Sequence, residues 1–140
     1  MRRILLDTGV LVALLDSSEN EHASCSRLFE DLHALLVTTE PVLTEAEYLL
    51  GPDVRARQTC IEFFTRGGAV LVPQSTRSLE RSATLMKKYS DVPMDFADAT
   101  LVVLAEEIGT SEVLTLDLKG FSTYRIKGRK TFDILPRAGK

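Results

Sequence analysis

The chain has 140 residues, of which 44% are hydrophobic and 26% charged, and its formal net charge is −3 at pH 7. This composition is typical of a globular protein that can bury a core, and we expect a single domain over residues 1–140. A net acidic chain excludes nucleic-acid binding through overall charge alone, so any such role requires a local basic patch.

Cysteine usage and hydropathy narrow the class of protein further. The two cysteines, Cys25 and Cys60, lie outside any CxxC or short Cys/His spacing, which favours small core residues over a disulfide framework or a zinc site. No apolar run approaches the roughly 18 residues of a membrane span, and the N-terminal residues resemble a strand rather than a signal peptide. We therefore expect a soluble, cytoplasmic protein.

The N-terminal half reads as alternating strands and helices. The apolar run Ile4-Leu5-Leu6 stops at Asp7, which predicts a buried strand. A short helix over 10–15 follows, and Ser18 and Glu21 have the spacing of a capping box for a helix that ends near residue 33. The pattern then predicts a strand at 35–38 and helices at 42–50 and 54–65.

The C-terminal half continues the alternation. We expect strands at 69–72, 113–116 and 131–135, and helices at 75–89 and 94–108. Strands that alternate with helices are joined by right-handed crossovers and form a parallel sheet. The sequence therefore predicts an α/β domain with a central parallel sheet of four to five strands.

Acidic residues stand where two of these strands end. Asp7 follows the first strand directly, and Asp117 follows the strand at 113–116, although a turn residue before Gly120 is the alternative explanation of Asp117. In an open α/β sheet, ligands bind at the carboxyl ends of the strands. If the two strands are neighbours, their terminal acids lie about 5 Å apart.

Two helices add further carboxylates. Asp95 and Asp98 are three residues apart at the start of a helix that is apolar nearly all round and is therefore buried. Asp95 has the position of an N-cap, whereas Asp98 lies deeper and is harder to explain as a cap. Glu45 and Glu47 lie in the helix at 42–50, and the residues alone leave open which of them faces the sheet edge.

Carboxylates gathered at one edge repel one another and require a cation to stay ionised together. A hard divalent ion such as Mg²⁺ or Mn²⁺ suits an oxygen-only set of ligands. The chemistry that uses such a cluster is phosphoryl transfer, in which the metal binds the scissile phosphate and activates water. Thr8 and Thr115 stand beside two of the acids, where their hydroxyls would orient a carboxylate, a water or a phosphate, or cap a turn.

The C-terminal segment has the opposite charge. Residues 119–140 carry a net charge of +6, with one acid, Asp133, so the rest of the chain carries −9. Such a segment is either a solvated surface or a contact for RNA phosphates. The candidate RNA-binding residues are Lys119, Arg125, Lys127, Arg129 and Lys130, with Arg55, Arg57 and Lys87 as further cations outside this segment.

Four motifs, in order, resemble those of the PIN domain family and, more narrowly, its VapC-type toxin ribonucleases. They are Leu5-Leu6-Asp7-Thr8, Pro41-Val42-Leu43-Thr44-Glu45, Pro93-Met94-Asp95-Phe96-Ala97-Asp98-Ala99 and Leu114-Thr115-Leu116-Asp117, with Phe121 after them. Gly9 departs from the family pattern, in which a Ser or Asn is frequent. The resemblance implies a three-layer α/β/α, Rossmann-like domain.

The resemblance also implies an activity and its residues. The metal-binding and catalytic acids would be Asp7, Glu45, Asp98 and Asp117, with Thr115 as a polar catalytic residue and Asp95 and Thr8 as additional site residues. It favours Glu45 over Glu47, because Glu45 has the motif position. It implies Mg²⁺- or Mn²⁺-dependent endoribonuclease activity, a homodimer and a cognate antitoxin protein, although some PIN domains have no antitoxin.

Other readings of the same residues belong to different classes. Residues 5–9 also match the active turn of a retroviral-type aspartic protease, but that fold is all-β. A phospho-acceptor receiver domain gathers acids at strand ends too, but it needs an acceptor Asp on the third strand, and 69–73 has none. A PIN-fold interaction module without nuclease activity, and a PIN nuclease outside any toxin–antitoxin pair, remain the alternatives.

Overall fold

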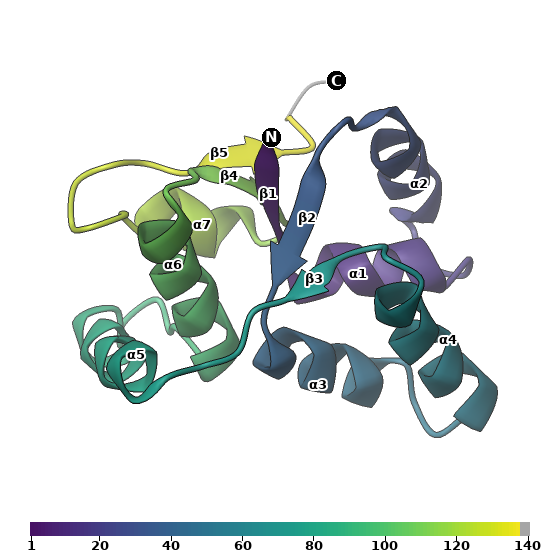
Figure 1. Cartoon of the computed structure of the whole chain (residues 1–140), viewed down its shortest axis with the longest axis horizontal. Coiled ribbons are helices and arrows are strands. Elements are labelled where there is room, and N and C mark those ends of the chain that lie inside the picture. Colours follow the sequence, from purple (N-terminus) through teal and green to yellow (C-terminus); the bar gives the residue numbers. More distant parts are fainter. Residues whose placement is uncertain (138–140) are drawn as a thin grey trace.

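The computed structural model describes residues 1–137, in which five strands form one parallel sheet (Figure 1). The strands are β1 (Arg3–Leu6), β2 (Leu35–Thr38), β3 (Val70–Leu71), β4 (Glu112–Leu114) and β5 (Asp133–Leu135). Their order is β3-β2-β1-β4-β5, and each neighbouring pair is parallel. The expected parallel sheet is thereby confirmed, with all five strands.

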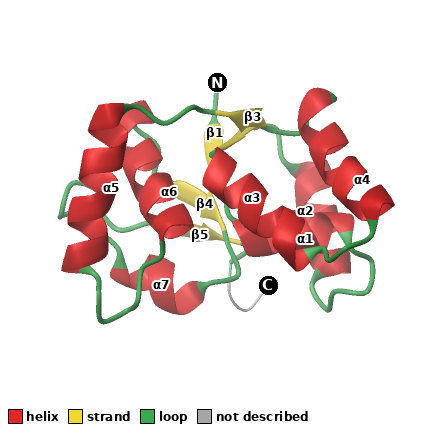
Figure 2. Ribbon diagram, turned by 90° about the horizontal axis from the view of Figure 1, so that it is seen from below, coloured by secondary structure: helices red, strands yellow, loops and turns green. Residues whose placement is uncertain are grey.

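Seven helices in the described residues cover the sheet. They are α1 (Thr8–Leu15), α2 (His22–Asp31), α3 (Glu40–Leu49), α4 (Val54–Thr65), α5 (Thr76–Lys88), α6 (Phe96–Ile108) and α7 (Leu118–Thr123). Figure 2 shows α5, α6 and α7 on one side of the strands and α1, α2 and α4 on the other. Helix α3 lies between the two groups and packs against both α1 and α6. This arrangement is the expected three-layer α/β/α fold.

The strand order creates a point at which the chain reverses direction across the sheet. From β1 the chain steps outward to β2 and β3, then returns to the other side of β1 to add β4 and β5. Strands β1 and β4 are therefore neighbours, with Leu6 paired to Leu114. In parallel sheets the crevice at such a switch point is where ligands bind, because the crossover helices diverge there.

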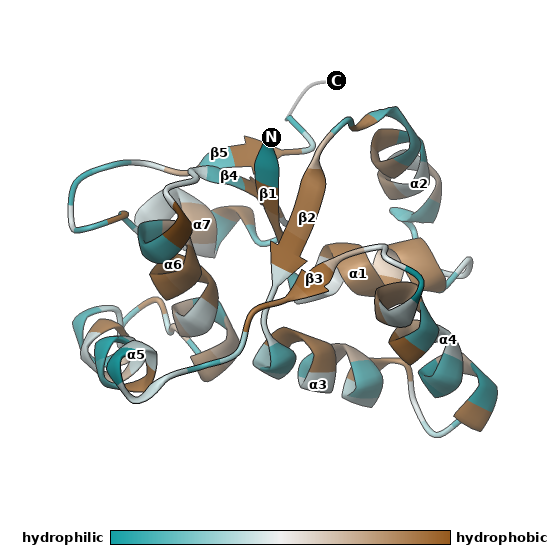
Figure 3. Ribbon diagram, viewed as in Figure 1, coloured by the Kyte–Doolittle hydropathy of each residue, from teal (hydrophilic) through white to brown (hydrophobic). Residues whose placement is uncertain are grey.

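Burial of the central elements explains why the strands and α6 form. The side chains of Ile4, Leu5 and Leu6 are fully buried, and α6 is buried from Ala99 to Ala105, as its apolar sequence predicts. Figure 3 shows hydrophobic colours along β2 and over much of α1 and α6. Both cysteines are buried and unpaired, which confirms them as core residues.

Several predicted boundaries were wrong, two of them because an aspartate caps a helix. Asp7 and Asp95 are N-caps, so α1 begins at Thr8 and α6 begins at Phe96, two residues from the expected starts. Strand β4 ends at Leu114 and β3 has two residues, so both are shorter than predicted. Helix α7 was not predicted, and it is the element that follows Asp117.

The Ser18–Glu21 capping box is also wrong. The Ser18 hydroxyl and amide both donate to Asp16 Oδ1, at 2.6 and 2.9 Å, in a turn after α1. Helix α2 begins at His22, with Glu21 as an N-cap residue that makes no side-chain cap hydrogen bond. Ser18 is therefore a turn residue, because the nearby Asp16 carboxylate accepts its hydrogen bonds.

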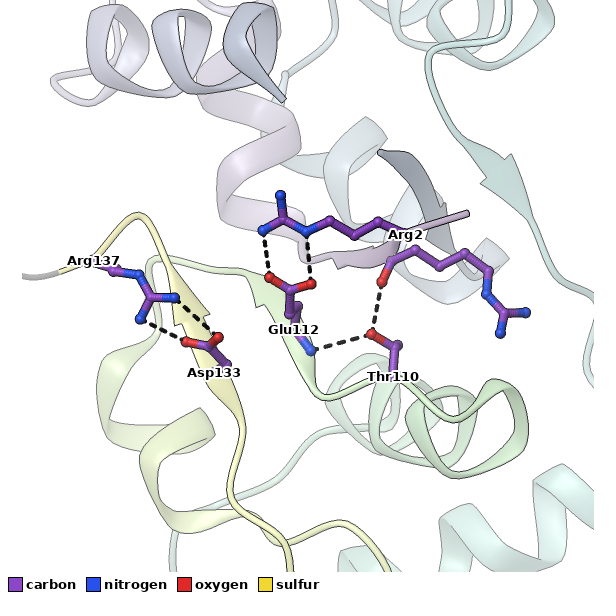
Figure 4. A network of polar contacts seen from close by, with 6 residues as sticks. Arg2, Thr110, Glu112, Asp133 and Arg137 are labelled. Atoms are coloured by element: carbon purple, nitrogen blue, oxygen red, sulfur yellow. Dashed lines mark hydrogen bonds and ion pairs between the residues drawn. The ribbon is translucent and has the colours of Figure 1, made fainter. Parts of the chain in front are cut away.

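A polar network ties the strands together near their N-terminal ends (Figure 4). Arg2 donates two hydrogen bonds to Glu112, with N–O distances of 2.9 and 2.6 Å. Arg137 pairs with Asp133 at 3.0 Å. The charge of Arg137 is therefore compensated within the fold, and Lys140, another cation of the basic segment, lies outside the described residues.

Membrane insertion through a helix finds no support in the described residues. None of the helices within residues 1–137 is both long and apolar enough to cross a bilayer.

Candidate active site

Strand β1 brings Asp7 to the switch point and holds it in place. The Asp7 amide donates to Leu114 O at 2.9 Å, which extends the β1–β4 ladder by one residue. Its Oδ1 accepts from the Thr8 amide at 2.8 Å and so caps α1. The side chain is 6% exposed, so the sequence has placed a carboxylate at the edge of the core.

Thr115 links the two acids that follow β1 and β4. Its hydroxyl donates to Asp7 Oδ2 at 2.6 Å and accepts from the Asp117 amide at 2.9 Å. Asp117 in turn caps α7 by accepting from the Gly120 amide at 3.0 Å. Thr115 is buried, and its single hydroxyl orients both residues.

The first turn of α6 brings two further carboxylates to the same edge. Asp95 Oδ1 accepts from the Asp98 amide at 2.8 Å, and Asp98 Oδ2 faces the Asp95 amide at 3.3 Å, which together form a capping box. Asp98 therefore does have a capping role, which its deeper position had made the less expected explanation. Its Oδ2 also accepts from the Tyr124 hydroxyl at 3.1 Å.

Helix α3 supplies the fourth acid. The Thr8 hydroxyl donates to Glu45 Oε1 at 2.7 Å, which fixes Glu45 beside the end of β1. Glu47 lies elsewhere: one of its carboxylate oxygens is buried without a hydrogen-bond partner, and the carboxylate faces the thiol of Cys60. The structure thus places Glu45, and not Glu47, at the sheet edge.

The four acids Asp7, Glu45, Asp98 and Asp117 line one pocket of about 370 Å³ at the carboxyl ends of β1 and β4. A larger pocket of about 950 Å³, between α3, α6 and the segment before α5, shares Glu45 and Asp95 with it. The residues that line the smaller pocket are Asp7, Thr8, Gly9, Glu45, Leu49, Asp95, Asp98, Leu116 and Asp117. The acids that the sequence singled out therefore converge.

Burial and mutual repulsion raise the pKa of two of these acids. Burial, together with the charges of Asp117 and Glu45, raises the pKa of Asp7 to about 6, against the lowering effect of the hydrogen bonds from Thr115 and Thr8. Burial, followed by the charges of Asp95 and Asp7, raises the pKa of Asp98 to about 7. The pocket therefore holds negative charge that the surrounding protein does not neutralise.

The donor set fits a hard cation, although its geometry is not that of a formed metal site. Within residues 1–137, no three His, Cys, Asp or Glu side chains are arranged to hold a metal ion. The carboxylates instead accept hydrogen bonds from Thr8, Thr115, Tyr124 and the Gly120 amide. Oxygen ligands carrying unneutralised charge nevertheless match the preference of Mg²⁺ and Mn²⁺.

The candidate RNA-binding residues do not gather at the carboxylates. Lys119 is exposed on α7, two residues after Asp117. Arg125 donates from Nη1 to the carbonyl oxygens of residues 122–124, so its guanidinium caps the end of α7. Lys127, Arg129 and Lys130 line a different pocket, beside the C-terminal end of α6.

Tyr124 is a site residue that the sequence interpretation missed. Its ring is fully buried and packs edge to face against Tyr89 and Phe121, with centroids 5.2 and 5.1 Å apart. This packing directs its hydroxyl to Asp98. Its spacing of three residues from Phe121 would place both rings on one face of a helix, but the sequence analysis predicted no helix there and could not use it.

Replacing Asp7 by Asn is expected to stabilise the metal-free protein at neutral pH. Because the pKa of Asp7 is raised from 3.8 to about 6 on folding, the folded state favours its protonated form. The cost of ionising Asp7 is absent below about pH 4, grows between about pH 4 and pH 6, and levels off at about 3 kcal/mol above that range. Urea unfolding of the wild type and the Asp7→Asn variant in the presence of a chelator should show a higher free energy of unfolding for the variant at neutral pH and no difference at acidic pH. Equal free energies of unfolding for the two proteins at both pH values would contradict the prediction.

The parallel sheet with an acidic pocket at its switch point defines a class of α/β domain, and the sequence comparison identifies its family. The model of the PIN domain family matches residues 4–127, so the chain belongs to the PIN domain family. The chain is also similar to Ribonuclease VapC26 of Mycobacterium tuberculosis, with 31% identity over 135 residues that cover 95% of this chain and all of that protein.

Solved structures with the same fold have lower sequence identity. The crystal structure of M. tuberculosis VapC20, described as a Sarcin-Ricin loop cleaving toxin, aligns with a TM-score of 0.75 and 18% identity over 86% of this chain and 95% of that one. A toxin–antitoxin complex from Klebsiella pneumoniae gives 0.63 and 19%, covering 86% and 91%. VapBC2 from Rickettsia felis, bound to a promoter DNA fragment, gives 0.63 and 13%, covering 94% and 98%. These likenesses confirm the PIN-like fold.

Proposed function

We propose that the protein is an endoribonuclease of the VapC type that requires Mg²⁺ or Mn²⁺ and acts as the toxin of a toxin–antitoxin pair. The observation that carries the proposal is the convergence of Asp7, Glu45, Asp98 and Asp117 on one pocket at the switch point of the sheet. The ribonuclease VapC26, which matches this chain over almost its whole length, supports the choice of RNA as substrate.

The four acids would hold the metal, and the hydroxyl groups around them would set their orientation. A divalent cation, when bound, supplies charge neutralisation at the scissile phosphate and activation of the attacking water. Thr115 holds Asp7 and Asp117 in register, Thr8 holds Glu45, and Tyr124 holds Asp98. Asp98, whose pKa is raised to about 7 by burial and by the charges of Asp95 and Asp7, must lose its proton before it can serve as a ligand.

The partners of the protein follow from the same proposal. A toxin of this type is paired with an antitoxin, and two of the proteins that share its fold were solved as toxin–antitoxin assemblies. We propose that this chain forms a homodimer and binds an antitoxin protein. We also propose that it acts in the cytoplasm. Size-exclusion chromatography with light scattering on the purified chain tests the dimer separately from activity.

The experiment that tests the activity is the sequencing of RNA ends after incubation of purified protein with total RNA and Mn²⁺. New ends at a reproducible sequence or structure are expected with the metal and not with a chelator. An unchanged set of ends in both reactions would reject the nuclease and favour a PIN-fold interaction module.

Metal binding is expected to depend on pH in the range where the acids titrate. Because Asp7 and Asp98 must lose their protons to act as ligands, and their pKa values are about 6 and 7, Mn²⁺ competes with protons below neutrality. The rise in melting temperature on adding Mn²⁺ should be large near pH 8 and shrink toward about pH 5. A change in melting temperature that is absent, or that does not depend on pH, would contradict the proposed ligands. The same measurement with Ca²⁺ tests a second cation that prefers oxygen ligands.

A further inference from the structure

Residues 126–130 form a basic hairpin between α7 and β5. The Ile126 amide donates to Lys130 O at 2.8 Å, and the Lys130 amide returns a bond to Ile126 O at 3.1 Å. Lys127 and Gly128 both have positive φ, at 52° and 73°, which closes the tight turn. The side chains of Lys127, Arg129 and Lys130 are exposed, and Figure 3 colours much of this loop as hydrophilic.

The fold anchors the hairpin, and Lys127 is the hairpin cation whose charge acts on a nearby carboxylate, that of Glu106. The Ile126 side chain is buried, and the Lys127 amide donates to Glu106 Oε2 at 2.9 Å. Glu106 already accepts two hydrogen bonds of 3.0 Å from the guanidinium of Arg81, so its charge is compensated by that residue. Among residues 1–137, no carboxylate lies within ion-pair distance of the three hairpin side chains.

The end of α5 adds a fourth cation to this surface. Lys88 is exposed, and its Nζ would lie 3.7 Å from a Cβ built on Gly128. A pocket of about 260 Å³ separates the hairpin from the C-terminal end of α6. We call this surface the hairpin patch; it consists of Lys88, Lys127, Arg129 and Lys130.

The hairpin patch and the acidic pocket lie at opposite ends of α6. Asp98 is in the first turn of that helix, whereas Glu106 and Gly109, beside the hairpin, are at its end. Thirteen residues at a rise of 1.5 Å make the helix about 20 Å long. Helix α7 starts at the pocket, carries the exposed Lys119 and leads along the chain to the hairpin.

We propose that the hairpin patch is a second contact for the RNA backbone, which holds phosphates on one side of the cut about one helix length from the carboxylates. This inference rests on the proposed ribonuclease function and adds to it a site that binds RNA phosphates independently of sequence. The acidic pocket repels a polyanion, so a remote cluster of unpaired cations supplies attraction and orients the approaching strand. The cations are long and exposed, which suits phosphates rather than base edges.

The test compares two pairs of charge-removing substitutions in the full-length chain. Lys127→Gln with Arg129→Gln removes two charges from the hairpin patch, and Arg27→Gln with Arg66→Gln removes two exposed charges from α2 and the end of α4. Both pairs are made in an Asp98→Asn background, so that a fluorescent single-stranded RNA oligonucleotide stays intact. Binding is measured over a series of salt concentrations, and melting temperatures verify folding.

We expect the hairpin pair to reduce the slope of log K against log salt by about 1.4, since each lost phosphate contact on single-stranded nucleic acid removes about 0.7. The loss should be similar for oligonucleotides of different sequence, and the control pair should leave the slope unchanged. Equal slopes for both pairs in folded proteins would overturn the inference. So would a hairpin pair whose only effect is on the binding of an acidic peptide.

Cleavage in the wild-type background separates this inference from the function on which it rests. With Asp98 intact, the hairpin pair should raise KM for the long oligonucleotide and leave kcat unchanged, because the patch does not contact the reacting atoms. If the hairpin pair cleaves RNA with an unaltered KM, the inference about the patch is rejected and the proposed nuclease function stands. If the hairpin pair lowers the salt slope of RNA binding as predicted but the wild-type protein cuts no RNA, the patch is supported and the nuclease is rejected.

Discussion

Asp98→Asn is expected to lower RNA cleavage by about a thousandfold with little loss of stability. Asn retains an oxygen that can accept from the Asp95 amide and the Tyr124 hydroxyl, so the capping box and the tyrosine contact can persist. The charge disappears from a pocket in which four carboxylates are proposed to share a cation. Losing several kcal/mol of transition-state stabilisation corresponds to a rate loss of this size.

The matched control for this variant is Glu107→Gln. Glu107 is an exposed acid at the other end of the same helix and takes no part in the pocket. Single-turnover cleavage of a labelled RNA with Mn²⁺ should be unaffected by the control and nearly abolished by Asp98→Asn. Undiminished cleavage by Asp98→Asn would reject the proposed site, and the melting temperatures of both variants would reveal any unfolding.

Thr115→Val is expected to affect both stability and activity, because one hydroxyl serves two acids. Valine keeps the shape of threonine, but Asp7 Oδ2 loses its 2.6 Å donor and the Asp117 amide loses its acceptor. A buried carboxylate that loses a hydrogen bond costs about 2 kcal/mol in the free energy of unfolding. Cleavage should fall about 10- to 100-fold, as it does when a group that orients a metal ligand is removed.

The pH profile distinguishes this role from a general loss of packing. Without the Thr115 hydroxyl, which lowers the pKa of Asp7, that pKa rises and the acidic limb of the cleavage profile should move to higher pH. Thr115→Ser keeps the hydroxyl and should restore the profile. Thr100→Val, which removes the buried Thr39–Thr100 hydrogen bond of 2.8 Å, should lower stability without moving the profile. An unmoved profile in Thr115→Val would assign Thr115 a packing role only.

Two errors of the sequence prediction, the missed helix α7 and the Ser18–Glu21 capping box, have a common physical cause: an aspartate accepts hydrogen bonds that the local pattern does not reveal. Helix α7 was overlooked because Asp117 and Gly120 both resemble turn residues. In the fold Asp117 caps the helix, and a Cβ at residue 120 would collide with its carboxylate, so the glycine is there to admit the cap. The Ser18–Glu21 capping box failed because the Asp16 carboxylate accepts the hydrogen bonds of Ser18.

Local pattern by itself determined which acids stand at element ends, since a buried strand must be apolar and its polar successor marks its end. This held for Asp7 and Asp117 after β1 and β4, for Asp98 in the first turn of α6, and for the alternation of strands and helices, whereas the choice of Glu45 came from the family resemblance. Only the tertiary structure decided how these ends meet. The order β3-β2-β1-β4-β5 brings Thr115 to Asp7 across 108 residues, and aromatic packing turns Tyr124 toward Asp98.

The basic segment, residues 119–140, also shows the difference between what the sequence and the fold determine. Its charge is evident in the sequence, but the fold assigns its members to different tasks: Arg125 caps α7, Arg137 pairs with Asp133, and the hairpin cations lie at the far end of α6. Charge is a property of composition, whereas the position of a charge depends on chain connections and packing between distant residues. The sequence therefore predicted which acidic residues give the pocket its chemistry. Only the packed sheet determined which other residues surround the pocket and where the basic residues lie.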